Sequence, residues 1–422
     1  MKDLETKYLY PKNPKKIKYP IYPYIQQLSD YKVFKSNYIS GHRENRLKTK
    51  LESLYKNSEI LLTNSGTSAL KMGLVCLDIK PNDEVMFTNF NCPNIIDAVL
   101  SIGATPVFVD IEEDFSLSFE DIKKKVNDKT KAIISTHVYG LKENLKIYDW
   151  AKKKNIYIVD DGAQAMFTLQ NNKFVGGHGD IGILSFGFTK PLSSIGGGAL
   201  IVNNKSLIGR LPKVPIETEE EVYIDYKNYF RSWVLCRLNT FYIPSKLNKV
   251  WYRLFKMPET YLSKTEAFPR NIRLIEIKRM NRLREELILK QFYRYKKIRD
   301  YNIANYQEMN NNLKCLVRYG IKLIHLDKGE SPNYYTLIFP NEHQRYECSE
   351  YLAGKGIQTC WNYIPLDEIP IYSKYKSNTK NANTVWGRVL SVPFKYPLVS
   401  KDIQYISLQL KNYIGKSTLL NI

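Results

Sequence analysis

Ser185-Phe-Gly-Phe-Thr-Lys190-Pro-Leu-Ser-Ser-Ile-Gly196-Gly-Gly198 is the stretch that decides the fold of this chain. It places Lys190 between a short aromatic strand and a glycine-rich turn, whose backbone can approach a flat ligand closely. A lysine that burial partly desolvates loses its proton more readily and becomes a nucleophilic amine, which can form a Schiff base with an aldehyde. The alternative is a solvated loop lysine, which is the usual state of this residue.

A Ser/Gly/Thr turn lies upstream, between the apolar run 60–62 and an apolar helical pattern over 70–77. The order strand, tight turn and helix predicts an anion site there. The free amides of the first helical turn and the hydroxyls of Ser65, Thr67 and Ser68 can all face a phosphate. An ordinary helix cap, in which one hydroxyl satisfies one amide, is the simpler alternative for this turn taken alone.

A third segment, 156–165, is an apolar β-type run that ends in Asp160 and Asp161. In an open α/β sheet, ligands bind beyond the carboxyl ends of the strands. A carboxylate at that edge can pair with a protonated ring nitrogen, which an electron-accepting pyridine requires. A structural role at the strand end is the alternative, and we expect it for one of the two aspartates.

Phosphate site, aspartate and lysine together supply the three contacts that pyridoxal phosphate (PLP) needs. In these residues the chain resembles the DegT/DnrJ/StrS family of PLP-dependent sugar aminotransferases, which have the α/β, type I aspartate aminotransferase fold. The resemblance covers most of the chain. It rests on five segments in the family's order, namely 64–70, 103–110, 137–140, 160–164 and 185–198.

The resemblance implies a role for each matching position. Lys190 corresponds to the catalytic Schiff-base lysine, Asp161 to the partner of the pyridine nitrogen, and Gln164 to the residue near the ring 3-hydroxyl. Asn271 corresponds to an asparagine that reaches the neighbouring subunit's phosphate, which implies a homodimer with shared sites. The positions that correspond to the phosphate contacts are Ser65, Gly66, Thr67 and Ser185.

Two segments depart from the family's pattern. Many members stack an aromatic residue on the cofactor, but counting back from Gly103 puts Cys92 rather than Phe90 at that position. Near the C-terminus the pattern Tyr-x-Pro-Leu-His ends here in Asp367, so the identity of the sugar stays open. His137 and Tyr139 either lie near the substrate or are satisfied core residues.

Composition is that of a globular enzyme, with 422 residues, 43% hydrophobic and 25% charged. No apolar run nears the ~18 residues of a membrane span. The first residues lack an apolar signal core, and the six cysteines form no Cys-x-x-Cys pair. We therefore expect a cytoplasmic protein with reduced thiols and no metal site.

The formal net charge is +21, and residues 201–300 hold 22 Lys and Arg against 11 Asp and Glu. A basic surface could attract a nucleotide diphosphate sugar or anionic lipid, and a solvated basic face is the alternative. We see no nucleic-acid-binding motif. A Gly-x-Gly-x-x-Gly match at 177–182 precedes a strand instead of following one, so it does not predict dinucleotide binding.

We expect three parts. Residues 1–202 form a large PLP-binding domain, in which strands that alternate with helices predict a mostly parallel sheet covered on both faces. Residues 203–270 form an insertion with an aromatic, basic run over 223–257. This run is either a helical insertion packed on protein, which we favour, or an amphipathic segment that lies weakly on membranes. Residues 271–422 hold a helix running from 271 to about 310 and a small α/β domain.

The expected function is transfer of an amino group from L-glutamate, or a similar amino-acid donor, to a keto sugar. The resemblance implies that the sugar is nucleotide-linked and serves cell-surface polysaccharide or amino-sugar biosynthesis. Two alternatives stay open. Some relatives dehydrate sugars with histidine in place of the lysine, although Lys190 argues against this. The other is a basic, membrane-associated homologue that keeps the fold without turnover.

Overall fold

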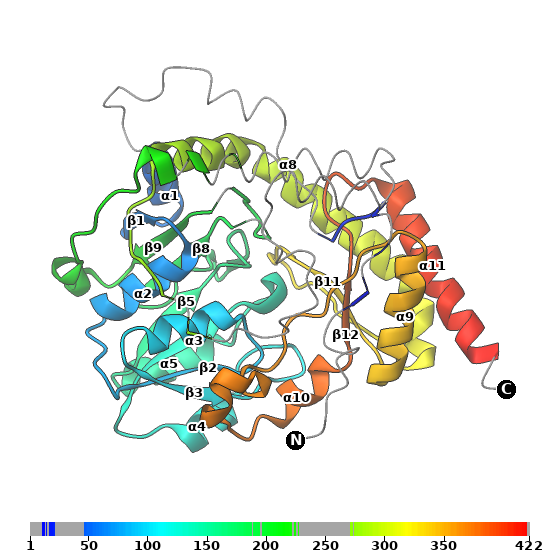
Figure 1. Cartoon of the computed structure of the whole chain (residues 1–422), viewed down its shortest axis with the longest axis horizontal. Coiled ribbons are helices and arrows are strands. Elements are labelled where there is room, and N and C mark those ends of the chain that lie inside the picture. Colours follow the sequence, from blue (N-terminus) through cyan, green and yellow to red (C-terminus); the bar gives the residue numbers. More distant parts are fainter. Residues whose placement is uncertain are drawn as a thin grey trace.

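The computed structural model describes residues 11–12, 14, 17–21, 46–187, 189–194, 196–221, 223–224, 227, 271–272 and 274–419. Most of the aromatic, basic run at 223–257 lies outside these residues, and so does most of the expected insertion. The described chain forms a large sheet domain and a smaller domain, and the long helix α8 (Arg282–Leu313) runs from one to the other (Figure 1).

The large domain is built on a seven-stranded sheet in the order β1-β9-β8-β5-β4-β2-β3. Strands β8, β5, β4, β2 and β3 are parallel, whereas β9 pairs antiparallel with both β8 and β1. This confirms the expected mostly parallel sheet. The strands are β1 (Glu59–Thr63), β2 (Glu84–Thr88), β3 (Thr105–Val109), β4 (Thr130–Thr136), β5 (Tyr157–Asp161), β8 (Ile181–Ser185) and β9 (Gly198–Val202).

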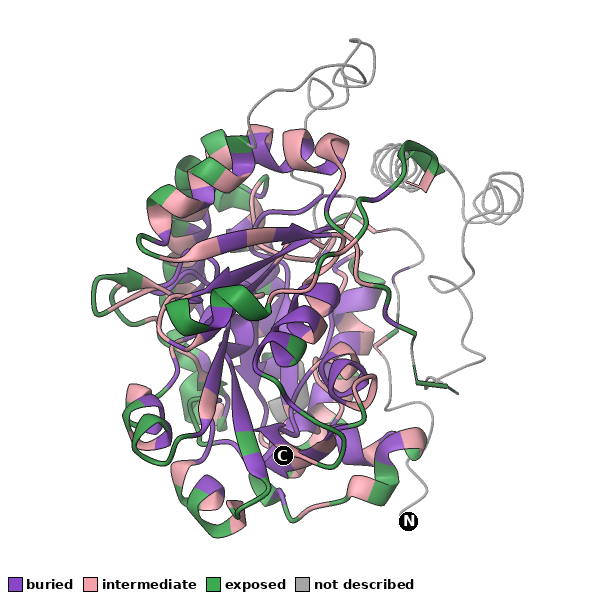
Figure 2. Cartoon of the chain, turned by 90° about the vertical axis from the view of Figure 1, so that its left-hand side faces the viewer, coloured by how far each residue is buried: buried purple, intermediate pink, exposed green. Residues whose placement is uncertain are grey.

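Helices cover both faces of this sheet because side chains alternate along each strand. Val85 and Phe87 of β2 pack in the cluster that holds α2 and α3, whereas Met86 packs in the cluster that holds α4 and α5. Most residues of the central strands are accordingly buried, as Figure 2 shows. The helices are α1 (Arg46–Leu54), α2 (Gly66–Cys76), α3 (Pro93–Leu100), α4 (Phe119–Lys125) and α5 (Leu145–Lys153).

The small domain has a three-stranded antiparallel sheet, β10-β11-β12. Its core includes Tyr306 and Met309 from the second half of α8, whereas Ile288 and Tyr295 from the first half belong to a core of the large domain. One helix therefore ties the two cores together. The domain's elements are β10 (Lys322–Leu323), β11 (Tyr335–Ile338), α9 (Glu342–Gly354), α10 (Lys380–Trp386), β12 (Val389–Val392) and α11 (Ser400–Leu419).

The remaining elements are short. A two-stranded ribbon, β6 (Leu169–Gln170) with β7 (Lys173–Phe174), lies between β5 and β8 in the sequence. Short 3₁₀ helices connect the larger elements at η3 (Val138–Gly140), η4 (Lys205–Arg210), η6 (Lys314–Tyr319), η7 (Leu366–Glu368) and η8 (Pro370–Tyr375). No described helix combines the length and the apolar character that crossing a bilayer would take.

Two expectations about local structure were wrong. The strand before Lys190 is aliphatic and ends at Ser185, so the phenylalanines follow it. The helix expected from 271 begins only at Arg282, because the preceding backbone pairs with the end of β1: the Asn64 amide donates to Lys278 O at 2.9 Å and the Met280 amide to Leu62 O at 3.2 Å. Asn281 then caps the helix by accepting from the Leu283 amide at 2.8 Å.

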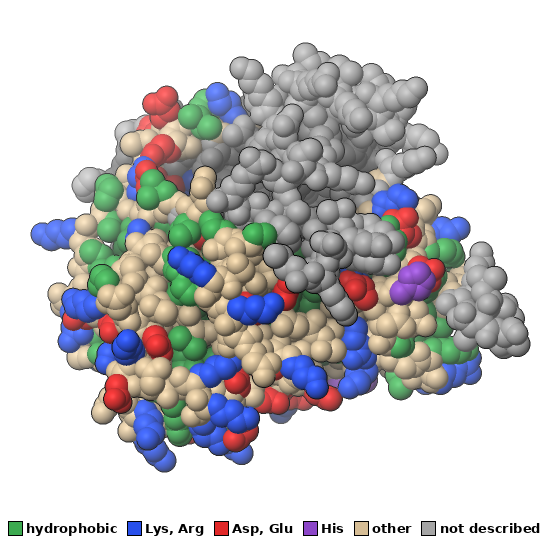
Figure 3. Space-filling model, turned by 60° about the horizontal axis from the view of Figure 1, so that its bottom comes forward, with side chains coloured by type: hydrophobic (Ala, Val, Ile, Leu, Met, Phe, Trp, Pro, Cys, Tyr) green, Lys and Arg blue, Asp and Glu red, His purple; other side chains and the backbone are tan. Residues whose placement is uncertain are grey.

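The surface shows how part of the positive charge is distributed. On the face in Figure 3, described Lys and Arg side chains are interspersed with Asp and Glu instead of gathering into one patch. Several lysines pair with nearby acids, such as Lys125 with Asp121 at 2.7 Å and Lys48 with Glu59 at 2.6 Å. On this face the described residues fit a solvated basic surface.

Candidate active site

The predicted site residues follow the ends of strands that point the same way. Asp161 is the last residue of β5, and Ser185 is the last residue of β8. The residues that come after a strand are Ser65, Gly66 and Thr67 after β1, Cys92 after β2, Gln164 after β5 and Lys190 after β8. Because these strands share an orientation, the residues come to one edge of the sheet. Asn271 comes from elsewhere: it is exposed, and no hydrogen bond joins it to another described residue.

The turn after β1 meets Ser185 directly. A Cβ added to Gly66 would lie 2.7 Å from Ser185 Cβ and 2.9 Å from Ser185 Oγ, and one added to Gly198 would lie 2.5 Å from the Gly66 nitrogen. Ser65 caps α2, since its hydroxyl accepts from the Ser68 amide at 3.0 Å. The cap alternative therefore holds for Ser65, while the turn still brings a helix N-terminus and the Ser185 hydroxyl together, as an anion site requires.

We expect Gly66→Ala to damage this turn. The new methyl group would overlap Ser185 and force either the turn or the end of β8 to move, at a cost of about 1–3 kcal/mol in the free energy of unfolding. Affinity for a phosphate-bearing ligand should fall at least tenfold. Gly209→Ala is the matched control, because nothing lies within 4 Å of its added Cβ. Urea unfolding and equilibrium dialysis with PLP would measure both effects, and equal behaviour of the two variants would contradict the prediction.

Asp161 is a buried carboxylate with neutral hydrogen-bond donors. It is 5% exposed, its Oδ1 accepts from the Ala163 amide at 3.0 Å, and its Oδ2 accepts from Thr136 Oγ1 at 3.2 Å. Burial raises the pKa of Asp161, while these donors and the charge of Lys190 oppose the rise. Among the described residues no cation lies within ion-pair distance of Asp161. A buried carboxylate of this kind is suited to a cationic partner supplied by a ligand.

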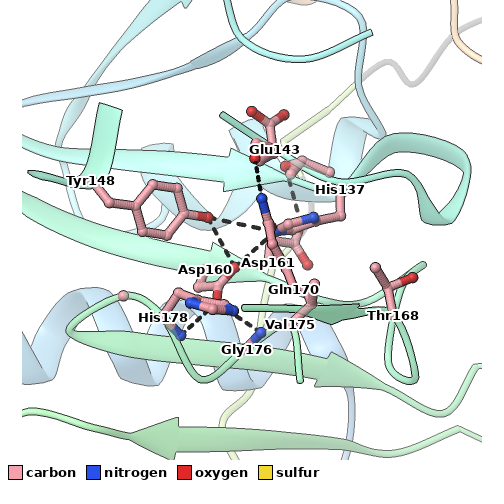
Figure 4. A network of polar contacts seen from close by, with 12 residues as sticks. His137, Glu143, Tyr148, Asp160, Asp161, Thr168, Gln170, Val175, Gly176 and His178 are labelled. Carbon is pink, nitrogen blue, oxygen red and sulfur yellow. Dashed lines mark hydrogen bonds and ion pairs between the residues drawn. The ribbon is translucent and has the colours of Figure 1, made fainter. Parts of the chain in front are cut away.

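Asp160, its neighbour, has a structural role (Figure 4). Asp160 Oδ1 lies 2.9 Å from His137 Nε2 and accepts from the Tyr148 hydroxyl at 3.0 Å. Its Oδ2 accepts from the amides of Gly176 and His178, both at 2.8 Å. With four partners and no exposed surface, Asp160 fixes the turn before β8. The structural alternative therefore applies to Asp160, and Asp161 stays the candidate partner of a ligand.

His137 is a satisfied core residue. It is 1% exposed, and its Nδ1 lies 3.0 Å from the Leu141 carbonyl while its Nε2 faces Asp160. Both ring nitrogens thus meet acceptors, which favours the doubly protonated ring. Burial by itself lowers the pKa of His137, but the hydrogen bond and charge of Asp160 outweigh it and the pKa rises.

Glu143 is a buried acid of this network that the sequence did not indicate. It is 3% exposed and accepts from the Leu117 amide at 3.1 Å. Burial raises the pKa of Glu143 from 4.5 to about 8, with the charge of His137 opposing the rise. The folded protein therefore holds this proton up to about pH 8, whereas the unfolded chain releases it near pH 4.5.

This difference in proton binding by Glu143 makes the free energy of unfolding depend on pH. Because the folded state binds the extra proton, the free energy of unfolding should fall as pH rises from about 5 to 8, by on the order of 3 kcal/mol. Glu143→Gln removes the titrating group, so its stability should change less over that range. Glu112→Gln, at an exposed position, is the control. Urea unfolding at pH 5.5 and 8.5 would test this, and parallel pH profiles of wild type and Glu143→Gln would contradict it.

Gln164 and Cys92 complete the predicted residues at this edge. Gln164 is 3% exposed, and its Oε1 accepts from the Tyr139 amide at 3.2 Å. Cys92 is half-buried at the N-terminal end of α3, whereas Phe90 is fully buried against Phe115, Tyr139 and Tyr363. Phe90 is therefore a core residue. The role of Cys92 toward the cofactor stays a prediction.

The two remaining uncertain positions are also packed in the interior. Tyr139 is 1% exposed and its hydroxyl donates to Asn362 O, so it is a core residue. Asp367, which stands where the family pattern has histidine, is 2% exposed, and its Oδ1 accepts from Asn89 Nδ2 at 2.7 Å. This pair ties η7 to the end of β2.

Lys190 lies in the turn after β8, where its amide donates to Gly187 O at 2.9 Å and its side chain is half-buried. A second lysine, Lys395, lies beside this turn. Its Nζ donates to Asn333 Oδ1 at 2.8 Å and to Thr189 O at 3.5 Å. Sequence reasoning could not place Lys395 near Lys190, because Lys395 follows a strand of the small domain 205 residues further along the chain.

Two curated proteins are similar to part of this chain. GDP-perosamine synthase from Vibrio cholerae is 33% identical over 170 residues, which are 40% of this chain and 46% of that protein. UDP-N-acetyl-3-dehydro-alpha-D-glucosamine 3-aminotransferase from Acidithiobacillus ferrooxidans is 36% identical over 169 residues, again 40% of this chain and 46% of that protein. The chain thus matches just under half the length of these two curated relatives.

A solved structure agrees over a longer range. NtdA from Bacillus subtilis, with bound cofactor PMP, superposes with a TM-score of 0.72 at 18% identity, over 96% of this chain and 87% of NtdA. This likeness shows a shared fold, which is the expected aminotransferase fold. Residues 26–214 and 242–411 match one family profile. The resemblance seen in the sequence is confirmed, and the chain belongs to the DegT/DnrJ/EryC1/StrS aminotransferase family.

Proposed function

We propose that this protein is a cytoplasmic, PLP-dependent aminotransferase that transfers an amino group from an amino-acid donor to a nucleotide-linked keto sugar. One observation carries the proposal: Lys190, the buried Asp161 and the turn of Gly66 against Ser185 lie at one edge of the sheet. Family membership and the names of the curated relatives, which are nucleotide-sugar enzymes, support it.

The residues present fit the cofactor. A Cβ at Gly66 would fill the space beside Ser185, so this turn suits a phosphate that needs close backbone approach. Asp161 has neutral partners and is suited to a protonated pyridine nitrogen. The turn of Gly66 and Thr67 and the Ser185 hydroxyl would hold the phosphate, Asp161 the ring nitrogen and Lys190 the aldehyde carbon, while the Ser65 hydroxyl caps α2. When bound, the cofactor supplies an electron-accepting ring that stabilises negative charge at the carbon losing its proton.

The chain's own residues then have separate tasks. Asp161 keeps a positive charge on its partner, and Thr136 and Ala163 hold the carboxylate in place through the bonds at 3.2 and 3.0 Å. The Lys190 amine would accept the proton from the donor's α-carbon and then donate it to the aldehyde carbon of the cofactor. Gln164 is held by the Tyr139 amide and would lie beside the 3-hydroxyl of the cofactor ring.

The finer parts of the proposal concern substrates and assembly. L-glutamate is the proposed donor, and a nucleoside diphosphate is the proposed carrier of the sugar. Asn271 is exposed and precedes the extended segment that runs beside Asn64 and Ser68, where Ser68 Oγ donates to Glu276 O at 2.9 Å. This placement supports a homodimer in which Asn271 reaches the partner's phosphate turn. We also propose that residues 1–202, 203–270 and 271–422 are the three parts of the chain.

The test is to separate amine transfer from dehydration. Purified protein is supplied with PLP, ¹⁵N-labelled L-glutamate and a panel of nucleotide-linked keto sugars, and the products are weighed by mass spectrometry. Incorporation of the labelled amine supports the proposal. Loss of water from the sugar without incorporation of nitrogen would support the dehydratase alternative. Cofactor binding without exchange from any amino acid would support the non-catalytic alternative.

A further inference from the structure

Two residues of the small domain lie against the turn that carries Lys190. Lys395 follows β12 and Asn333 precedes β11, and these strands are antiparallel neighbours with Tyr335 opposite Val392. The register therefore places the two side chains together, and Lys395 Nζ donates to Asn333 Oδ1 at 2.8 Å. Lys395 Nζ also reaches the carbonyl of Thr189, the residue before Lys190, at 3.5 Å.

Lys395 is a cation without an acidic partner among the described residues. It contacts the Asn333 oxygen, the Thr189 carbonyl and the face of Tyr334, whose ring centre lies 5.4 Å from Nζ. Burial, together with the charge of Lys190 and against an opposing effect of Cys360, lowers the pKa of Lys395 to about 7. A partly desolvated ammonium group with neutral neighbours is stabilised by any anion that reaches it.

Asn333 offers a second donor at the same place. It is 1% exposed, and its Nδ2 has no hydrogen-bond partner in the described structure. The lysine fixes the orientation of the amide, since only Oδ1 can accept from Nζ. A buried amide N–H₂ without an acceptor is costly, so this group also calls for an acceptor from outside the chain.

The backbone ties this pair to the predicted cofactor site. The Asn333 amide donates to Tyr139 O at 2.7 Å, and the Tyr139 amide donates to Gln164 Oε1 at 3.2 Å. Asn333 and Lys395 thus connect Gln164 on one side with the Lys190 turn on the other. The pair offers two donors, with no acidic partner among the described residues, at the turn that carries Lys190.

We propose that Lys395 and Asn333 bind the α-carboxylate of the amino-acid donor, an inference that rests on the proposed function. The α-carboxylate is attached to the carbon whose amine is transferred, so the donor's carboxylate must lie near the turn that carries Lys190, and Lys395 Nζ contacts that turn at the Thr189 carbonyl. Two donors also suit the two oxygens of a carboxylate. A pyrophosphate has more oxygens, and the sugar ring separates it from the reacting carbonyl.

Three variants test the proposal in the full-length protein reconstituted with PLP. Lys395→Met removes the charge and keeps the length, Lys395→Arg keeps the charge, and Lys401→Met is the control at an exposed position of α11. Titration calorimetry measures the dissociation constants of maleate, a dicarboxylate that cannot react, and of inorganic pyrophosphate. Rapid mixing of each half-reaction separately gives the donor and acceptor concentrations at half-saturation.

We expect Lys395→Met to weaken maleate and L-glutamate about ten- to hundredfold, because a charge-assisted hydrogen bond is lost. Pyrophosphate binding and the half-saturating concentration of keto sugar should change less than about threefold. Lys395→Arg should recover most of the donor affinity, and Lys401→Met should match the wild type. Asn333→Asp would place a fixed carboxylate on Lys395, so it should weaken maleate at least tenfold without lowering the melting temperature.

Other results would overturn the proposal. Unchanged maleate binding in Lys395→Met, or no maleate binding to the wild type, shows that the lysine does not bind the donor. Loss of pyrophosphate binding with intact maleate binding assigns the lysine to the nucleotide instead. The calorimetry needs no turnover, so maleate binding that depends on Lys395 in a protein that transfers no amine would reject the proposed function and leave the carboxylate site standing.

Discussion

Lys190→Ala is expected to reduce amine transfer at least about a thousandfold. The substitution removes both the amine that would bond to the cofactor and the group that would move the proton, and proton transfer alone contributes about 10²–10⁴-fold. Lys190 is half-buried, and within the described residues only its backbone amide forms a hydrogen bond, so the fold should tolerate the change. The rate with L-glutamate, measured by formation of 2-oxoglutarate, gives the effect.

Lys131→Ala serves as the matched control, because Lys131 is exposed on β4 and its Nζ donates only to Asp128 O at 2.9 Å. Its rate should equal that of the wild type. Added small amines should recover part of the activity of Lys190→Ala, because they can replace the missing base. A Lys190→Ala variant that transfers amines at more than a tenth of the wild-type rate would sink the assignment of Lys190.

The second large effect is expected for Asp161→Asn. An amide cannot hold a positive charge on the ring nitrogen, so the rate should fall about 10²–10³-fold, as it does when one electrostatic contact to a transition state is removed. Asparagine keeps the volume and can still accept from the Ala163 amide, so the fold should survive. Asp161→Glu should recover little, because the added methylene would move the carboxylate away from its donors on Thr136 and Ala163.

Asp160→Asn is the matched control for Asp161→Asn, since the two residues are neighbours with different partners. Removing the charge of Asp160 leaves His137 without its ion-pair partner, so the free energy of unfolding should fall by about 3 kcal/mol. Asp161→Asn should change stability much less and catalysis much more. Urea unfolding and steady-state rates on both variants would show this contrast, and its reversal would mean that the two aspartates are assigned the wrong way round.

Most of the large domain could be predicted from the sequence, because its strands are marked by short apolar runs that can be recognised without knowing the rest of the fold. The apolar runs at 84–88 and 199–202 became β2 and β9, since a short apolar run bounded by polar turns has few other ways to be buried. The places of the candidate site residues at the ends of these strands were predictable for the same reason, whereas their roles toward the cofactor stay predictions. The start of α8 was not predictable from periodicity, since the backbone of 274–280 pairs with the end of β1 instead.

The parts that depend on the arrangement of the two domains were not predictable. Lys395 and Asn333 lie beside the turn that carries Lys190 because β11 and β12 place them at the end of the small sheet that faces this turn. Glu143 escaped notice for a similar reason, since its burial beside Leu117 and His137 comes from packing between distant segments. In a single sequence these residues look like ordinary surface lysines and acids.

The central claim is that the amine of residue 190, and no other, bonds to the cofactor. The direct measurement is reduction of the PLP-loaded protein with borohydride, followed by digestion and mass spectrometry of the labelled peptide. We predict a single pyridoxyl group on Lys190, with Lys395 unlabelled. A label on Lys395 or on any other lysine, or a protein that takes up no label, would contradict the account.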